Sequence, residues 1–383
     1  MLALVESWAA INSGSCNLPG LAAMADRLAD AFAVLPGPAR LIEGDAVEAI
    51  DADGRAVTVE HGRNLHLQVR PNAPLQLLLT GHMDTVFGPD HAFQQCRWIG
   101  PGRLNGPGVA DMKGGLAVML AALEAIERGT IAPTIGYEIV INSDEELSSP
   151  GSAGLIARAA AGKAAAFTYE PALAGGALAG ARPGSGTFSI IIAGRAAHAG
   201  RDPENGRNAV LAAADIALRL AGGAGPELKV NPSRIDGGGP VNIIPAHAVL
   251  RVNLRPLTIE AERAALRMID EIVGRVCADH DVSAQVHGGF ARPPKPFGAG
   301  VQRLTALVQQ CGRDLDIPLD VIPSGGVCDG NNIAALGVPV IDTMGVRGGA
   351  IHSADEFLET DSLVERARLS ALAITRLASG GAP

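Results

Sequence analysis

The stretch Leu75–Lys113 constrains the fold of this chain more than any other part of the sequence. It opens with a short apolar run, Leu75–Leu79, bounded by turn signals, which is typical of a strand buried on both faces of a parallel sheet. His82 and Asp84 follow directly where this strand ends, and Asp111 comes at the end of a Gly/Pro-rich loop. Ligand sites of open α/β sheets lie beyond the carboxyl ends of the strands. The stretch therefore predicts a functional site rather than core packing.

Strand-like and helix-like segments alternate over residues 1–183. The apolar run Ile135–Ile141, the helical segment Ser152–Ala161 and the strand Ala164–Tyr169 give the pattern. The same alternation resumes over residues 294–383, with a strand at Val338–Asp342 and a closing helix at Glu359–Ser379. This alternation is typical of α/β proteins. We expect one domain, built from both parts, with a mostly parallel sheet covered by helices.

Residues 184–293 follow a different order, with Pro/Gly clusters at both ends. The predicted elements are strand Thr187–Ala193, helix Asn208–Leu220, strands Glu227–Ile235 and Ala246–Leu254, helix Ile259–Asp279 and strand Ser283–Val286. The order β-α-β-β-α-β is that of a ferredoxin-like unit. We therefore predict a second domain inserted into the first.

Composition excludes several classes of function. The 383 residues are 47% hydrophobic, carry a net charge of −9 and include only 3% aromatic residues. An acidic chain with few aromatics is a poor partner for nucleic acid or an anionic membrane. The five cysteines are scattered without a C-x-x-C pair, and no signal peptide or membrane span is evident. We expect a cytoplasmic protein with neither nucleic acid nor a membrane as a partner.

Candidate metal ligands follow strands or strand-like runs throughout the α/β part. There are five of them: His82, Asp111, Glu146, Glu170 and His352. Imidazole and carboxylate donors without thiolate suit catalytic zinc or a related first-row cation. Five donors exceed what one tetrahedral ion with an open position uses, whereas two ions bridged by one carboxylate would use all of them.

Glu145 and Glu146 are the sharpest local feature. Adjacent side chains in an extended turn point in different directions, so one can bind a cation while its neighbour faces a water molecule as general base. For an isolated Glu-Glu pair an acidic, solvated loop is the simpler interpretation. The position after a strand and the other four candidates favour the catalytic interpretation.

Seven segments carry a resemblance to a known family: GHMDTV, GPGVADMKGG, NSDEELSSPGS, YEP, GRAAHAG, PVNIIPAHA and GAIHSADE. They resemble the motifs of the two-zinc aminoacylase and carboxypeptidase family of metallopeptidases. This family includes bacterial glutamate carboxypeptidase, acetylornithine deacetylase and succinyl-diaminopimelate desuccinylase. The resemblance runs from about Leu4 to the C-terminal helix, and among these branches it is strongest to glutamate carboxypeptidase.

The resemblance implies a role for each candidate. Asp111 would bridge two divalent ions, and the remaining ligands would be His82 and Glu170 for one ion and Glu146 and His352 for the other. Zinc is the expected metal, with cobalt or manganese as alternatives. Glu145 would be the general base, and Asp84 would hold the imidazole of His82 in the correct tautomer.

The inserted domain resembles the lid and dimerisation domain of the family, which implies a homodimer. His198 corresponds to a histidine that stabilises the oxyanion and reaches the site of the partner subunit. Asn242, Arg255 and Arg292 match positions that hold the carboxylate of the substrate, and a bidentate arginine suits that anion. Closure of the lid would complete the site.

Simpler structural roles stay open for several of these residues. Asp84 can cap a turn, His198 can be a surface loop residue, and Arg255 can be a solvated residue at a strand end. Asn242 and Arg292 can fix the backbone beside prolines.

We expect a metal-dependent hydrolase that cleaves the amide bond of an N-acyl or peptidyl amino acid with a free α-carboxylate. A glutamate-like substrate is favoured, and an N-acyl amino-acid deacylase or dipeptidase is the alternative. A non-catalytic scaffold would lack a ligand or the base, and none is missing. Two departures from the family pattern are Cys328, where relatives have a small hydroxyl residue, and Ala197, where some have Ser. Motifs for serine hydrolases, P-loops and dinucleotide binding are absent.

Overall fold

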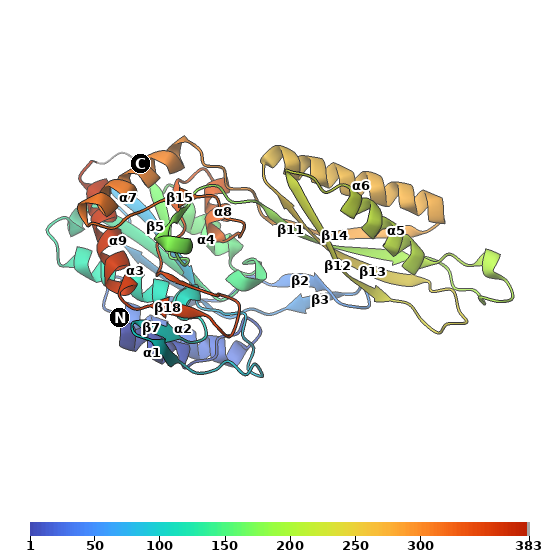
Figure 1. The fold of residues 1–383 in the computed structure, drawn as a ribbon, viewed down its shortest axis with the longest axis horizontal. Coiled ribbons are helices and arrows are strands. Elements are labelled where there is room, and N and C mark those ends of the chain that lie inside the picture. Colours follow the sequence, from blue (N-terminus) through green and yellow to red (C-terminus); the bar gives the residue numbers. More distant parts are fainter. Residues whose placement is uncertain (381–383) are drawn as a thin grey trace. The chain divides into compact units, whose positions relative to one another are not determined.

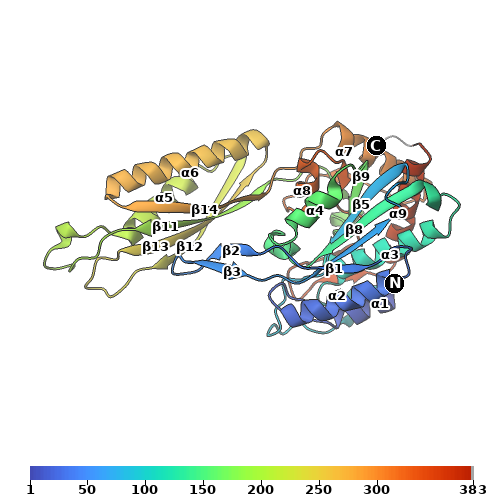
Figure 2. The same cartoon turned by 180° about the vertical axis from the view of Figure 1, so that it is seen from behind.

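The computed structural model describes residues 1–380, which form two compact units (Figures 1 and 2). The first unit comprises Met1–Ala46, Glu60–Ala181 and the chain from Pro296 onward. The second unit comprises Val47–Val59 and Arg182–Lys295.

The first unit is an α/β unit with a central sheet. Its strands are β1 (Arg40–Ile42), β4 (Asn64–Val69), β5 (Leu75–His82), β6 (Arg97–Gly100), β7 (Arg103–Asn105), β8 (Ile135–Asn142), β9 (Ala165–Thr168), β10 (Leu178–Ala179), β15 (Val321–Ile322), β16 (Val340–Ile341), β17 (Gly348–Gly349) and β18 (Phe357–Glu359). Its helices are α1 (Leu2–Ala9), α2 (Leu18–Phe32), α3 (Gly114–Glu127), α4 (Ala153–Ala160), α7 (Ala299–Asp314), α8 (Asp329–Ala335) and α9 (Ser362–Ala378). Single helical turns lie at Val109–Lys113, Ala132–Thr134, Glu145–Leu147 and Ala174–Gly176.

The central sheet has the strand order β1-β4-β8-β5-β9-β16. The strands β8, β5, β9 and β16 are mutually parallel, whereas β4 pairs antiparallel with both of its neighbours, β8 and the edge strand β1. The prediction of a mostly parallel sheet is therefore confirmed. Since the four parallel strands end at the same edge, the loops that follow β5, β8, β9 and β16 gather there.

Both faces of this sheet are buried, as the apolar run of β5 predicts. Leu77 and Leu79 belong to the core cluster that contains residues of α2, α3 and α9, whereas Leu78 belongs to the cluster of α4 and α8. Successive side chains of a strand point to opposite faces. An unbroken apolar run is therefore what a strand with helices on both sides requires.

The second unit combines strands and helices in the predicted β-α-β-β-α-β order. Its elements are the hairpin β2 (Val47–Ile50) and β3 (Ala56–Val59), then β11 (Ser185–Ala193), a single helical turn at Pro203–Asn205, α5 (Ala209–Gly222), β12 (Leu228–Gly237), β13 (His247–Pro256), α6 (Ile259–His280) and β14 (Ser283–Arg292). The four long strands form an antiparallel sheet in the order β12-β13-β11-β14. Alternate residues such as Ile190, Leu250 and Val252 are fully buried against α5 and α6.

The hairpin β2–β3 groups with the second unit, although the sequence prediction included it in the first domain, over residues 1–183. The guanidinium of Arg251 on β13 donates to the carbonyl oxygens of Ile50 and Asp51, at 2.9 and 2.8 Å. These hydrogen bonds join segments 200 residues apart. No local pattern in the sequence reports such a contact.

Three segments differ from their predicted structure. Residues 97–105, expected as loop, form β6 and β7, and β7 pairs with β18. Because residues 357–359 take part in that pairing, α9 begins at Ser362 rather than at Glu359. The last strand of the second unit extends to Arg292 rather than Val286, since its whole length pairs with β11.

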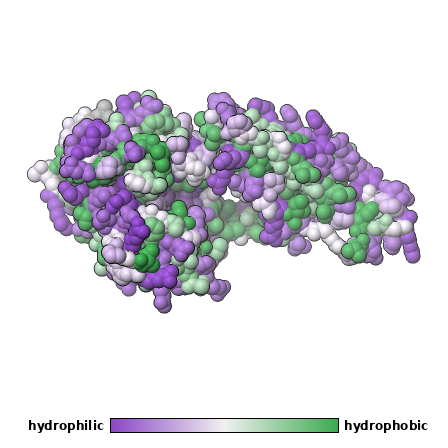
Figure 3. Space-filling model, viewed as in Figure 1, coloured by the Kyte–Doolittle hydropathy of each residue, from purple (hydrophilic) through white to green (hydrophobic). Residues whose placement is uncertain are grey.

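Hydrophilic residues are spread over the visible face of each unit, with smaller hydrophobic areas between them (Figure 3). Among residues 1–380, no helix combines the length and apolar character needed to cross a membrane.

Candidate active site

His82 is the last residue of β5, and its side chain is buried. The parallel pairing puts His82 opposite Asn142 on β8 and Thr80 opposite Thr168 on β9. Glu170 comes two residues after Thr168 and therefore reaches the level of His82. The Nε2 atom of His82 lies 3.8 Å from Oε2 of Glu170.

The carboxylate of Asp111 lies between two imidazole rings. Its Oδ1 atom is 3.1 Å from Nε2 of His82, and its Oδ2 atom is 3.1 Å from Nε2 of His352. The same nitrogen of His352 is 3.3 Å from Oε2 of Glu146. Neighbouring ligand atoms of a tetrahedral zinc ion are about 3.3 Å apart, given bonds of about 2.0–2.1 Å. The spacing therefore fits donors that share cations, with one oxygen of Asp111 directed to each imidazole.

Glu145 and Glu146 lie in the single helical turn that follows β8. Ligand atoms of His82, Asp111 and Glu146 all lie within 4.8 Å of one another, as do those of His82, Glu145 and Glu170. The two neighbouring glutamates thus reach different partners around His82. The structure brings together all five predicted ligands and the predicted base.

Asp84 is fully buried behind this group. Its Oδ1 atom is 3.3 Å from Nδ1 of His82, and its carboxylate accepts hydrogen bonds from the backbone N–H of Glu145 and of Glu146, both at 3.2 Å. The hydroxyl of Ser15 donates a further hydrogen bond of 2.7 Å. Asp84 therefore both contacts the imidazole of His82 and caps the turn that carries the two glutamates.

The clustered charges shift the pKa values of the site. Burial opposes the charge of Asp111, but hydrogen bonds from His352 and His82 outweigh it and lower the pKa of Asp111. Hydrogen bonds to Asp111 and Glu146 raise the pKa of His352 to about 10. Burial is the main cause that raises the pKa of Glu146 to about 7. The site therefore retains protons that a bound divalent cation would displace.

The comparisons with known proteins agree with this geometry. Residues 78–376 match the model of peptidase family M20/M25/M40. The chain is a member of this family. It is 30% identical over 328 residues to carboxypeptidase G2 of Pseudomonas sp. (strain RS-16), covering 83% of this chain and 78% of that protein. It is 27% identical over 304 residues to succinyl-diaminopimelate desuccinylase of Maricaulis maris (strain MCS10), covering 73% of this chain and 75% of that protein.

The fold agrees as well. Aminopeptidase PepT of Bacillus cereus ATCC 10987 superposes with a TM-score of 0.74 at 23% identity, covering 98% of both chains. As a member of the M20/M25/M40 family, the protein is a metallopeptidase that hydrolyses amide bonds in a metal-dependent reaction. Its imidazole and carboxylate cluster has the donor set that such a reaction requires.

Glu356 is a buried residue of the peptidase that the sequence analysis did not single out. Its carboxylate accepts hydrogen bonds from the backbone N–H groups of Gly108, Ala110 and Asp111, at 3.1, 2.9 and 3.0 Å. Burial raises the pKa of Glu356 to about 7, although these three donors act in the opposite direction. The only signal in the sequence is its place in the segment GAIHSADE, four residues after His352.

A buried polar network behind the Glu145–Leu147 turn also escaped the sequence analysis. Asn142 donates to the hydroxyls of Ser149 and Ser152 and to the carboxylate of Asp329, at 3.1, 3.0 and 2.9 Å. The hydroxyl of Ser152 donates to Asp144 at 2.5 Å. This network fixes both ends of the loop between β8 and α4. It includes the first residue of α8, directly after the buried Cys328.

His198 and Asn242 lie close together in loops of the second unit. The backbone N–H of Ala199 donates to the carbonyl of Asn242 at 2.9 Å, and His198 forms a β-bridge with Ile243. The Nδ1 atom of His198 accepts a hydrogen bond from the N–H of Gly200 at 3.1 Å. Both His198 and Asn242 lie beyond the end of β11 at Ala193.

Arg255 and Arg292 lie at the other end of the same sheet. Arg292 pairs with Ser185, the first residue of β11, and Arg255 follows Leu254, the partner of Gly186. Arg255 donates to the side-chain oxygen of Asn253 at 3.1 Å. β11 has nine residues, so the two predicted pairs are separated by roughly 27 Å of strand at about 3.4 Å per residue. The structure does not bring the four residues together.

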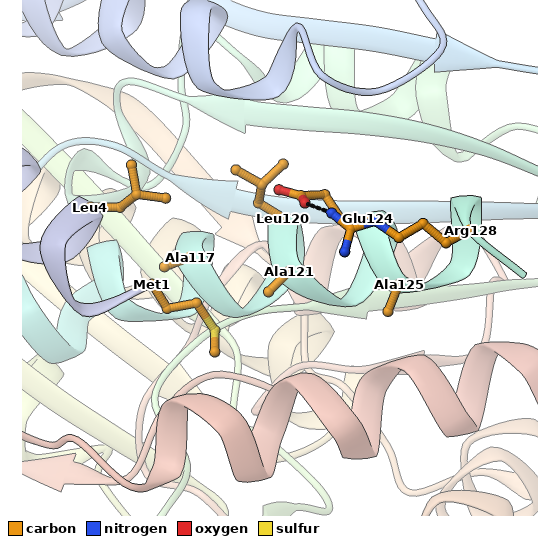
Figure 4. Close-up of a pocket in the computed structure, with 8 residues that line it drawn as sticks. All are labelled: Met1, Leu4, Ala117, Leu120, Ala121, Glu124, Ala125 and Arg128. Carbon is orange, nitrogen blue, oxygen red and sulfur yellow. Dashed lines mark hydrogen bonds and ion pairs between the residues drawn. The ribbon is translucent and has the colours of Figure 1, made fainter.

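A pocket elsewhere on the first unit contains none of the predicted site residues (Figure 4). It is lined by residues from the start of α1 and from α3, and Glu124 near the end of α3 pairs with Arg128. Small alanine side chains make up most of its α3 lining, so this hollow lacks the convergent polar groups of an active site.

Proposed function

We propose that the peptidase binds two divalent cations, most simply zinc, with cobalt or manganese as alternatives. Asp111 would be the shared ligand, His82 and Glu170 would complete one ion, and Glu146 and His352 would complete the other. The observation that supports this proposal is the position of Asp111, with each carboxylate oxygen 3.1 Å from a different imidazole. A bridging carboxylate needs this arrangement of two oxygens facing separate groups of donors.

The cations, Glu145 and Asp84 would each have a separate role in the hydrolysis. When bound, a pair of such cations polarises a carbonyl group and makes a water molecule more acidic. Glu145 would take the proton of the attacking water and transfer it to the leaving nitrogen. Asp84 would hold the imidazole of His82 and, through hydrogen bonds from the backbone N–H groups of Glu145 and Glu146, the position of the turn that carries Glu145.

The proposed substrate is an N-acyl or peptidyl amino acid with a free α-carboxylate, with glutamate as the favoured residue. Two relatives support this class by their names, a carboxypeptidase and a succinyl-diaminopimelate desuccinylase. An N-acyl amino-acid deacylase or a dipeptidase is the alternative, because the same metal site serves any of these amides.

The second unit would contribute the remaining groups. Arg255 and Arg292 would bind the carboxylate of the substrate, and His198 would stabilise the oxyanion, with Asn242 beside it. The two pairs lie at opposite ends of one sheet, a separation far beyond the length of a small amide substrate. If both pairs act on one substrate, they come from different copies of the chain. This supports a homodimer formed through the second unit, in which His198 serves the site of the partner subunit.

Metal analysis and a substrate panel test the proposal. The purified protein should contain close to two divalent ions per chain. Glutamate amides with acetyl, succinyl, pteroyl and aminoacyl groups should be hydrolysed in the presence of zinc, cobalt or manganese. A protein with no stoichiometric metal and no turnover of any amide would instead support the scaffold alternative. The cytoplasmic location stays a prediction from the scattered cysteines.

A further inference from the structure

Two segments of the first unit, 245 residues apart, meet at Glu356. Its side chain is 1% exposed, and its carboxylate receives three backbone N–H groups from the Asp111 loop. Oε2 accepts from Gly108, whereas Oε1 accepts from both Ala110 and Asp111. Gly108 has a φ of 72°, a left-handed conformation that helps successive N–H groups converge on one anion.

Further hydrogen bonds extend this junction on the backbone. The side-chain amide of Asn105 donates to the carbonyl oxygens of Ala354 and Glu356, at 3.0 and 2.7 Å. The N–H of Gly106 donates to the carbonyl of Glu356 at 3.3 Å. Phe357, the first residue of β18, is paired with Asn105. The loop that ends at Asp111 and the loop that begins at His352 are therefore fixed to each other.

Asp84 and Glu356 make the same kind of hydrogen bond, each to the backbone of a different proposed metal ligand. Asp84 accepts the N–H of Glu146 at 3.2 Å, and Glu356 accepts the N–H of Asp111 at 3.0 Å. Each is a buried carboxylate bound to the backbone of a proposed metal ligand. Groups that orient a metal ligand typically change metal affinity or activity by about 10- to 100-fold when they are replaced.

We propose that Glu356 is a positioning residue that fixes Asp111 relative to His352 and thereby sets the affinity of one of the two cations. This inference rests on the two-cation site proposed above. The ion of His352, Asp111 and Glu146 has two ligands on the segments that Glu356 joins. The ion of His82, Asp111 and Glu170 has only one. Loss of the Glu356 carboxylate therefore weakens the first of these ions more than the second.

Glu356→Gln removes the charge while it retains the size of the side chain. The amide nitrogen is a donor, so at least one backbone N–H of the Asp111 loop loses its acceptor. Glu356→Asp retains the charge on a shorter side chain and serves as the second variant. Glu359→Gln is the matched control, because Glu359 lies three residues after Glu356, on β18, and its carboxylate forms ion pairs with Arg103 and Arg347.

The metal-free proteins are titrated with Co²⁺, with calorimetry and visible absorption as readouts, and kcat and KM are measured with excess metal. His352→Ala identifies the binding step of the affected ion. In Glu356→Gln this step weakens by about 10- to 100-fold, the absorption of that Co²⁺ changes, and kcat falls more than KM rises. Glu356→Asp shows a smaller loss of the same kind, and Glu359→Gln matches the wild type.

Wild-type affinities and spectra in both folded Glu356 variants would overturn the proposal while leaving the two-cation site intact. A wild-type protein that binds no Co²⁺ would instead refute the proposed function itself. Failure of both variants to fold, judged by circular dichroism, would also overturn the proposal. In that case Glu356 would be a residue of the fold rather than of the metal site.

Discussion

The two units of the peptidase differ in what they bury. At the carboxyl edge of the parallel sheet, the first unit buries His82, Asp84, Asp111 and Glu170, all ionisable. In the second unit, the buried side chains between Gly186 and Ala291 are apolar, and the buried charged residues Arg182, Arg292 and Lys295 lie at the two ends of the segment Arg182–Lys295. Burying charge costs free energy unless each group finds a partner. The first unit thus gathers buried ionisable groups around the candidate site, whereas the sheet and helices of the second unit enclose an apolar core.

The largest expected effect is on kcat, from replacing Glu145 at the carboxyl edge of the parallel sheet. Glu145→Gln removes the proposed proton acceptor but none of the proposed ligands, so kcat should fall by about 10²- to 10⁴-fold. Metal content should stay at the wild-type value, as measured by elemental analysis of the purified variant. Unchanged turnover would show that Glu145 is not the general base, and would weaken the contrast between the units.

A substitution in the apolar core of the second unit should instead lower stability and leave metal content unchanged. Leu250→Ala leaves a cavity at a fully buried position of β13, and the free energy of unfolding should fall by about 2–5 kcal/mol. Metal content should not change, since no proposed ligand lies in this unit. Chemical denaturation followed by circular dichroism measures the first quantity. Loss of metal from the folded variant would contradict the separation of roles.

The stability of the chelator-treated protein should depend on pH because Glu146 and His352 at the candidate site titrate. The pKa of Glu146 rises from 4.5 to about 7 and that of His352 from 6.5 to about 10, so the folded state binds more protons than the unfolded state between these values. The free energy of unfolding should therefore fall as pH rises from about 5 to 9, by roughly 1–3 kcal/mol after the shift of the half-exposed His352 is discounted for solvent screening. The pKa of Asp111 is lowered, so Asp111 changes the free energy of unfolding only below its ordinary pKa of 3.8.

Added zinc supplies the control for this experiment. Metal binding requires deprotonated ligands, so zinc should stabilise the protein more at pH 8 than at pH 6. A chelator-treated protein that becomes more stable between pH 6 and 9 would contradict the assigned pKa shifts. Urea titrations at each pH, with and without zinc, measure both trends.

The smallest expected effect is on KM, from a substitution that tests whether the second unit contributes to substrate binding. Arg255→Ala should raise KM for carboxylate-bearing substrates by about tenfold with little change in kcat, since ground-state binding is lost. Arg234→Ala is the control, because Arg234 is an exposed arginine of the neighbouring strand that pairs with Asp236. If both variants retain the wild-type KM, Arg255 is only a residue at the end of a strand.

Much of the site follows from the sequence because its cause is local. An apolar run predicts a buried strand, and parallel strands end at one edge, so residues that follow such runs collect there. This reasoning selected His82, Glu146 and Glu170 as candidate ligands from their positions after strands. It also predicted that Glu145 and Glu146 diverge, because neighbours in a turn point in different directions.

The sequence by itself determined the α/β alternation, the inserted β-α-β-β-α-β unit and the set of side chains with metal-binding chemistry. Only the tertiary structure decided which of them meet. The carboxylate of Glu356 beneath Asp111, the hairpin at Arg251 and the opposite positions of His198 and Arg255 all depend on strand register and on contacts between distant segments. Periodicity reports which face of an element is buried, but not which remote segment packs against it.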